Sequence, residues 1–233
     1  MAGTKILFAD DDPEIREVIR LLLSSEGYEV IEAADGDEAV NKMEPSIDLV
    51  ILDVMMPGRS GIAACAEIRR VSTAPILFLT AKSQDSDKAV GFSAGGDDYM
   101  AKPFSYAELT ARVKAMLRRY RVYRGKGETA AAADAITLPG GLTIRTDRNE
   151  VVLGGAPVAL TDLEYRILLL LARNRRQTFS AQQIYERIWQ EPYYYSANNT
   201  VMVHIRNLRK KLEDDANHPH LIKNIWGKGY CIE

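Results

Sequence analysis

Five side chains suited to phosphoryl chemistry stand at the ends of apolar segments in the first half of the chain. They are the carboxylates Asp10, Asp11 and Asp53, the hydroxyl of Thr80 and the ammonium of Lys102. Carboxylates that converge in one place repel one another unless a cation lies among them, and all-oxygen ligands favour a hard ion such as Mg²⁺. The set predicts phosphoryl transfer to Asp53, because a metal and a lysine would neutralise the transferring oxygens.

The segments that must position these residues alternate short β-branched runs with amphipathic stretches. Strands are expected at residues 5–9, 28–33, 49–52, 76–79 and 98–101. Asp12 suits the N-cap of the first helix and Pro13 its first turn, and the helix should end at Gly27. Five βα units across residues 1–121 predict a doubly wound parallel α/β sheet. Ligands of such sheets collect at the carboxyl ends of the strands, which is where the five side chains stand.

The second half of the chain has a different character. Residues 122–136 lose the periodicity and suggest a linker, although their alanine run could form a short helix. Glycine-punctuated short strands follow, which is typical of antiparallel hairpins. Capping boxes at residues 161–164 and 180–183 open two helices, a third is expected at 199–213, and a hairpin at 222–232 closes the chain. This half should be a smaller α+β domain.

The third of these helices separates apolar from basic side chains. Four aliphatic residues should be buried on one face: Val201, Ile205, Leu208 and Leu212. The opposite face carries Asn199, Val203, Arg206, Asn207 and Lys210, with His204 and Lys211 on a flank. Cations that seek phosphates, amides that read base edges and an aliphatic group that meets a thymine methyl suit entry into the major groove of DNA. With Lys228 in the closing hairpin, the pattern predicts a winged helix-turn-helix.

Length and composition agree with two packed domains. The chain has 233 residues, of which 46% are apolar and 27% charged. Its longest apolar stretch, residues 167–172, is far shorter than the roughly 20 residues that span a bilayer. No secretory signal is visible, and the two cysteines, Cys65 and Cys231, fit no metal or redox spacing. We therefore expect a cytoplasmic protein with free thiols and no membrane partner.

The net charge of −2 conceals an asymmetry. Residues 1–121 carry 15 basic and 20 acidic side chains, a net of −5, whereas residues 122–233 carry 15 and 12, a net of +3. An acidic front and a basic back are typical of modules with different partners, a cation for the first and a polyanion for the second.

The motifs FADDD, ILDVMMPGRSG, LTA and DYMAKPF make the first half resemble the receiver domain of two-component response regulators, a flavodoxin-like fold. The resemblance implies that Asp53 accepts a phosphoryl group from the phosphohistidine of a sensor kinase. It implies that Mg²⁺ is held by Asp10, Asp11, Asp53 and the main-chain carbonyl of Met55. It also gives Lys102 a contact with the phosphoryl group, and makes Thr80 and the inward-rotating Tyr99 the switch residues.

The motifs LTDLEYRILLLLARN, NNTVMVHIRNLRKKLED and IKNIWGKGYCIE resemble the OmpR/PhoB-type effector domain, from about residue 137 to the end. The resemblance places Val203, Arg206 and Asn207 in the major groove and the wing near the minor groove. Many members carry arginine where this chain has Asn207, and arginine often precedes the wing glycines, where this chain has Trp226. Trp226 is therefore not counted among the DNA contacts, and packing under the wing is the alternative for it. Residues 193–195, three tyrosines, fall where the family can meet RNA polymerase, and packing against the recognition helix is an equal alternative for them. The C-terminal motifs resemble VanR-type regulators.

Activated receivers of this subfamily dimerise through the face formed by their fourth helix, fifth strand and fifth helix. The charges match in type, and the resemblance implies three pairs across a twofold axis: Lys88 with Glu108, Asp97 with Arg112, and Asp98 with Arg119. Exposed pairs contribute about 0–1 kcal/mol each, so they would set register more than affinity.

The sequence therefore predicts a phosphorylation-activated transcriptional regulator with a receiver (1–121), a linker (122–136) and a winged-helix domain (137–233) that binds tandem promoter half-sites as a dimer. Its only enzymatic activity would be self-phosphorylation and self-dephosphorylation at Asp53. Two alternatives stay open at this point. One is a pseudo-receiver that binds DNA without phosphorylation. The other is an aspartyl-phosphate hydrolase that uses Asp10 and Asp12, although Glu14 stands where that motif usually has Thr or Val.

Overall fold

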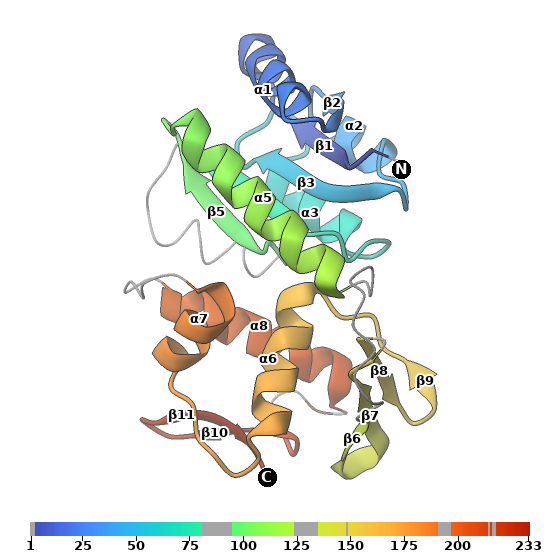
Figure 1. Cartoon of the computed structure of the whole chain (residues 1–233), viewed down its shortest axis with the longest axis vertical. Coiled ribbons are helices and arrows are strands. Elements are labelled where there is room, and N and C mark those ends of the chain that lie inside the picture. The colour runs from blue at the N-terminus through green and yellow to red at the C-terminus, as the bar shows by residue number, and fades with distance from the viewer. Residues whose placement is uncertain are drawn as a thin grey trace. The chain divides into compact units, whose positions relative to one another are not determined.

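A computed structural model describes residues 3–80, 95–123, 135–147, 149–190, 197–213, 215 and 218–233, with the side chains of 121–123 and 197–199 left aside. The chain divides into two compact units, Met1–Tyr120 and Arg121–Glu233, and each is described by itself (Figure 1). Within the described residues, no helix has the length and apolar character needed to cross a membrane.

The first unit is built on a five-stranded parallel sheet with the strand order β2-β1-β3-β4-β5. The strands are β1 (Lys5–Ala9), β2 (Glu29–Ala33), β3 (Ile47–Asp53), β4 (Ile76–Thr80) and β5 (Asp98–Ala101). Residues Ile76–Thr80 are all buried, which is expected of a strand covered on both faces. The chain reverses direction across the sheet between β1 and β3, so the switch point lies between these two strands. The predicted doubly wound fold is confirmed.

Helices cover the sheet: α1 (Pro13–Ser25), α2 (Gly36–Asn41), α3 (Gly61–Ile68) and α5 (Tyr106–Tyr123). Figure 1 shows α5 lying across one face of the sheet. There, Leu109, Val113 and Met116 share a buried cluster with Ile19 and Leu23 of α1. Helix α5 runs to Tyr123 and β6 begins at Ala135, so both reach into the span expected for the linker. Residues 124–134, with the alanine run, lie outside the described part.

The second unit pairs a four-stranded antiparallel sheet with three helices and a terminal hairpin. The sheet holds β6 (Ala135–Leu138), β7 (Leu142–Arg145), β8 (Glu150–Leu153) and β9 (Ala156–Pro157), with a 3₁₀ turn η1 (Pro139–Gly141) between β6 and β7. The helices are α6 (Asp162–Arg173), α7 (Ala181–Trp189) and α8 (Ala197–Leu212), and the hairpin consists of β10 (Ile222–Ile225) and β11 (Gly229–Ile232). This is the predicted α+β winged helix-turn-helix arrangement.

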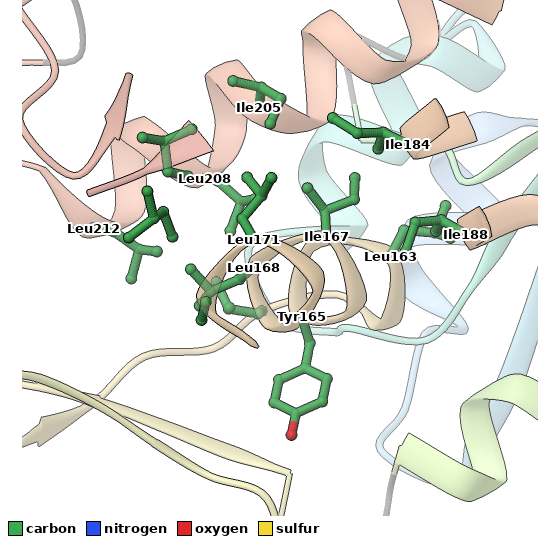
Figure 2. Close-up of a cluster of buried hydrophobic side chains, with 14 of the residues drawn as sticks. Leu163, Tyr165, Ile167, Leu168, Leu171, Ile184, Ile188, Ile205, Leu208 and Leu212 are labelled. Atoms are coloured by element: carbon green, nitrogen blue, oxygen red, sulfur yellow. The ribbon is translucent and has the colours of Figure 1, made fainter. Parts of the chain in front are cut away.

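Helix α6 is the centre of the second core. Figure 2 shows Leu163, Ile167 and Leu171 of α6 directed toward residues of α7 and α8, while Tyr165 leaves the opposite side of the helix. The buried face of α8 includes Val201, Ile205, Leu208 and Leu212, as the helical periodicity predicts.

Both predicted capping boxes of the second unit are present. Thr161 Oγ1 accepts from the Glu164 amide at 3.3 Å, and Glu164 Oε2 accepts from the Thr161 amide at 2.8 Å. Ser180 and Gln183 exchange the same two bonds at the start of α7. These reciprocal bonds satisfy amides that the first helical turn would otherwise leave unpaired, so they fix where α6 and α7 begin.

Candidate functional site

The carboxylates converge at the carboxyl ends of β1 and β3. These strands pair in parallel with Ala9 opposite Leu52, so the residues that follow, Asp10 and Asp53, end side by side. Asp10 is fully buried and Asp53 is buried at 6% exposure, while Asp11 is exposed. One oxygen of each of the three carboxylates lies within 4.8 Å of the others. The convergence predicted from the strand ends is present.

Lys102, one residue beyond β5, reaches across the sheet to this cluster. Its Nζ donates to Asp10 Oδ2 at 2.7 Å and to Asp53 Oδ2 at 2.9 Å. Its amide donates to the carbonyl of Thr80 at 2.7 Å, which continues the β4–β5 pairing to the end of the strands. The ammonium group therefore lies between the two buried carboxylates, where it balances part of their charge.

In this cluster, burial and ion pairing shift the pKa values of the charged groups in opposite directions. Burial raises the pKa of Asp10, and the Lys102 ammonium only partly offsets that effect. For Lys102, burial acts to lower the pKa, but hydrogen bonds to Asp10 and Asp53 outweigh it, so the pKa is raised. Lys102 therefore stays charged at neutral pH, and ionised Asp10 carries a desolvation penalty that an additional cation would relieve.

Local structure holds the loops around the cluster in place. The Asp12 side chain caps α1 by accepting from the amide of Glu14 at 2.8 Å, and Arg16 donates to the carbonyls of Asp10 and Asp11. At Gly61, a Cβ atom would lie 2.0 Å from the carbonyl oxygen of Asp53. Only glycine lets α3 begin this close to the end of β3. The Asp12 side chain therefore has a structural role at the start of α1.

Thr80 and Tyr99, the predicted switch residues, lie on the adjacent strands β4 and β5. Thr80 ends β4 and is 1% exposed. Tyr99 is buried, and its ring centroid lies 4.9 Å from that of Phe78, its partner in the β4–β5 register. Met55 follows β3, and its amide donates to Asp53 Oδ1 at 3.3 Å. Its side chain is exposed.

In the second unit, α8 presents the predicted basic face. Arg206 and Lys210 are exposed, and Val203 and Asn207 are half-buried. Met202, which the sequence analysis missed, is also exposed, and its spacing of four from Arg206 places it on this face. The side chain of Asn199 lies outside the described part.

His204 does not belong to this face, so its prediction as a DNA contact is wrong. It is 1% exposed, and its ring centroid lies 5.6 Å from that of the buried Trp189 of α7. The periodicity places His204 on the flank between the two faces, and packing of α7 against α8 moves this flank into the core. Lys211, on the same flank, pairs with Glu164 of α6 at 2.6 Å.

The closing hairpin differs from the prediction at its tip. Trp226 is 94% exposed, so it does not pack under the wing. It lies in the turn between β10 and β11, which is closed by a bond from the Lys228 amide to the Ile225 carbonyl at 2.9 Å. Lys228 is exposed, as expected of a residue that could reach DNA.

The charges predicted for a dimer face make contacts inside the chain. Asp97 Oδ2 accepts from the Ile76 amide at 2.8 Å and from Arg69, so this carboxylate has a structural role at the start of β4 and β5. Arg112 pairs with Asp98 at 2.9 Å and with Glu108 at 3.3 Å. The side chain of Arg119 is half-buried, and Lys88 and the tyrosines at 193–195 lie outside the described residues. Pairing of Asp97 and Arg112 across a twofold axis would require them to exchange these partners.

A parallel sheet with a carboxylate cluster, a hydroxyl and a lysine at its strand ends defines a phosphoacceptor module, and the second unit defines a winged-helix DNA-binding module. Comparison with known proteins agrees with both. A family model described as "Response regulator receiver domain" matches residues 6–114, and one described as "Transcriptional regulatory protein, C terminal" matches residues 155–232.

Two curated relatives match over nearly their full length. The transcriptional regulatory protein YrkP of Bacillus subtilis is 51% identical over 226 residues, 97% of this chain and 96% of the relative. The regulatory protein VanR of Enterococcus faecium is 41% identical over 230 residues, 98% of each chain. A solved structure of a RitR mutant is 25% identical with a TM-score of 0.72 and covers 99% of both chains.

The chain therefore belongs to the OmpR/PhoB family of two-component response regulators. It is a phosphorylation-dependent transcriptional regulator, and its partners include DNA and a sensor histidine kinase. The expected similarity to VanR-type regulators is confirmed.

Proposed function

We propose that Asp53 accepts a phosphoryl group from the phosphohistidine of the sensor kinase. An Asp53 oxygen attacks phosphorus, a P–O bond forms, the P–N bond breaks, and the imidazole leaves with a proton. The observation that carries this proposal is the Lys102 ammonium, which lies 2.9 Å from Asp53 Oδ2 and can neutralise the incoming oxygens. Thr80, at the end of the neighbouring strand, and the buried Tyr99 are the candidates to respond to the new charge.

The three carboxylates fit a divalent cation. Their oxygens lie within 4.8 Å of one another, Asp10 is buried at a cost, and oxygen ligands suit Mg²⁺. Asp10, Asp11, Asp53 and the main-chain carbonyl of Met55 would hold the ion. When bound, Mg²⁺ supplies charge neutralisation of the transferring phosphoryl oxygens. Lys102 then contacts the phosphoryl group, and Asp53 remains the nucleophile.

A groove beside the cluster suits the approach of the kinase. It has a volume of about 540 Å³ and is lined by residues of α1 and of the segment from β5 to α5: Asp12, Glu14, Ile15, Val18, Ile19, Lys102, Pro103, Phe104 and Tyr106. Val18 and Tyr106 are 40% and 54% exposed. Because Lys102 lines both the groove and the phosphoacceptor site, a helix that docks here would bring its phosphohistidine to Asp53.

The direct test is incubation of the chain with a small phosphodonor and Mg²⁺, followed by intact-mass measurement and mapping of the acid-labile phosphate. Wild type should gain one phosphoryl group on Asp53, and Asp53→Asn should gain none. Asp12→Asn is the matched control, because this carboxylate caps α1 without joining the cluster and asparagine is an equally good cap. Labelling of Asp10 would favour the hydrolase, and an unlabelled wild type would favour the pseudo-receiver.

For the second unit, the proposal places α8 in the major groove of promoter DNA. Arg206, Lys210 and Lys228 supply cations for phosphates, while Val203 and Asn207 can reach base edges. Dimerisation on phosphorylation, binding to tandem half-sites and contact with RNA polymerase complete the proposal. Self-dephosphorylation at Asp53 and a cytoplasmic location remain expectations.

A further inference from the structure

Arg16, the fourth residue of α1, contacts the loop that follows β1 with its side chain. This side chain is half-buried, and its Nη1 donates to the carbonyl oxygen of Asp10 at 2.7 Å and to that of Asp11 at 3.0 Å. The Arg16 amide donates to the carbonyl of Asp12 at 3.0 Å. One arginine therefore engages the main-chain carbonyls of three consecutive residues, and two of these belong to the carboxylate cluster.

The peptide unit between Asp11 and Asp12 is held on both of its sides. Its carbonyl oxygen accepts from Arg16, and its N–H donates to Asp10 Oδ1 at 3.1 Å. The C=O and N–H groups of a trans peptide point in opposite directions within one rigid plane. The bond from Arg16 therefore turns the N–H on the other side toward the Asp10 carboxylate. Because Asp10 Oδ2 accepts from Lys102 at 2.7 Å, each oxygen of this buried carboxylate has a hydrogen bond that fixes it.

Arg16 and Lys102 act on the cluster in different ways. Lys102 donates directly to the carboxylate oxygens of Asp10 and Asp53 and balances part of their charge. The guanidinium of Arg16 donates to main-chain carbonyls, so it orients the chain without occupying a carboxylate oxygen. This matters most for Asp11, which is exposed, so that burial does not restrict its side chain. The bond to the Asp11 carbonyl restricts the main chain from which that carboxylate projects.

We propose that Arg16 is a positioning residue for the divalent cation of the phosphoacceptor site, because it fixes the main chain that carries the Asp10 and Asp11 carboxylates. This role rests on the proposed metal site. Groups that orient metal ligands by hydrogen bonding matter for affinity, and their loss typically weakens metal binding about tenfold to a hundredfold. Charge alone predicts the opposite sign, since a nearby cation repels the incoming ion and its removal would strengthen binding. The direction of the change therefore separates positioning from charge.

The first test is titration of the full chain with MgCl₂, followed through the amide NMR signals of the receiver unit. Arg16→Ala should raise the dissociation constant for Mg²⁺ about tenfold to a hundredfold. Arg16→Lys keeps the charge and can donate to one of the two carbonyls, so it should raise the constant less. Arg20→Ala is the matched control and should bind Mg²⁺ as wild type does, because Arg20 lies one turn further along α1 and pairs with Glu17 at 2.7 Å and Glu32 at 3.2 Å.

The second test measures phosphorylation by a small phosphodonor over a range of Mg²⁺ concentrations. Arg16→Ala should raise the Mg²⁺ concentration that gives half of the maximal rate by a factor similar to that of the dissociation constant, and the maximal rate should fall much less. A general loss of folded protein would instead lower the maximal rate and leave the half-saturating concentration unchanged. That second pattern would contradict a positioning role for Arg16.

The outcomes for wild type and variants distinguish this role from the metal site itself. Binding of Mg²⁺ by Arg16→Ala that equals or exceeds that of wild type would overturn the role of Arg16 alone. If Arg16→Ala does not fold, Arg16→Lys decides, since weakened binding beside a normal Arg20→Ala supports positioning and wild-type binding overturns it. A wild type without a saturable response to MgCl₂ would refute the proposed metal site, and the role of Arg16 with it.

Discussion

At the scale of single residues, the proposed phosphoacceptor site combines buried carboxylates with an ammonium group that balances part of their charge. Asp10 is fully buried, and its pKa is raised because water is excluded from it, even though Lys102 lies 2.7 Å away. A carboxylate in this position weakens the fold when it is ionised. Residues that serve ligand binding often lower the stability of the fold in this way.

This cost leads to a stability prediction for Asp10→Asn. A raised pKa means that the folded state holds the proton more strongly than the unfolded state, so stability falls as pH rises from the ordinary aspartate range through the raised pKa. Removing the charge should therefore raise the free energy of unfolding at neutral pH, by on the order of 1 kcal/mol. Urea unfolding would show a gain that shrinks as the pH is lowered toward about 4.

Two controls accompany this measurement. Asp12→Asn, which keeps the cap of α1, should leave the unfolding free energy within a few tenths of a kcal/mol. Mg²⁺ should raise the melting temperature of wild type, because a ligand of the folded state stabilises it by mass action, but it should have much less effect on Asp10→Asn. A variant less stable than wild type at neutral pH would contradict the argument.

At the scale of elements, charge on one face of α8 is expected to determine the affinity for DNA. Arg206→Ala should weaken binding to a DNA duplex that the phosphorylated protein has enriched from a random-sequence pool. It should also reduce the dependence of the binding constant on salt concentration by about one ion, because one phosphate contact is lost. Arg145→Ala is a matched control, since this exposed arginine lies on β7 and pairs with Glu150. Fluorescence anisotropy at several salt concentrations measures both the affinity and its salt dependence. An equal salt dependence for Arg206→Ala and Arg145→Ala would contradict the role of α8 in binding phosphates.

Local signals were sufficient to predict most elements of this chain. β1 and β5 have the predicted bounds, because charged residues and turn signals flank each run. Both capping boxes form, since they need only residues three positions apart. β3 begins two residues earlier than predicted, at Ile47, because the edge of an apolar run gives little information about where pairing begins.

The predictions for His204 and Asp97 failed because both residues contact segments that are distant in the sequence. His204 is buried because Trp189 packs over it, and no periodicity within α8 contains that information. Asp97 is engaged by Arg69, 28 residues earlier, so a carboxylate that resembles a dimer contact is part of the core of its own unit. In contrast, the convergence of Asp10, Asp11, Asp53 and Lys102 was predictable, because strand ends of a parallel sheet share one edge.

At the scale of the whole molecule, phosphorylation is expected to change the oligomeric state. Wild type treated with a small phosphodonor and Mg²⁺ should dimerise, while Asp53→Asn should remain monomeric, because only the former can carry the added charge. Light scattering coupled to size-exclusion chromatography measures the mass. Donor-treated Asp12→Asn should behave as wild type. Dimers of Asp53→Asn equal in amount to those of phosphorylated wild type would contradict the switch.

The buried carboxylate of Glu164 connects two helices of the DNA-binding unit. It accepts from the Thr161 amide at the start of α6 and from Lys211 of α8 at 2.6 Å. The first turn of α6 therefore cannot fray without losing a contact with α8. The Thr161 amide should exchange with deuterium only through global opening of the unit, at the same rate as the slowest amides of its core. The start of α6 and helix α8 are therefore expected to unfold together.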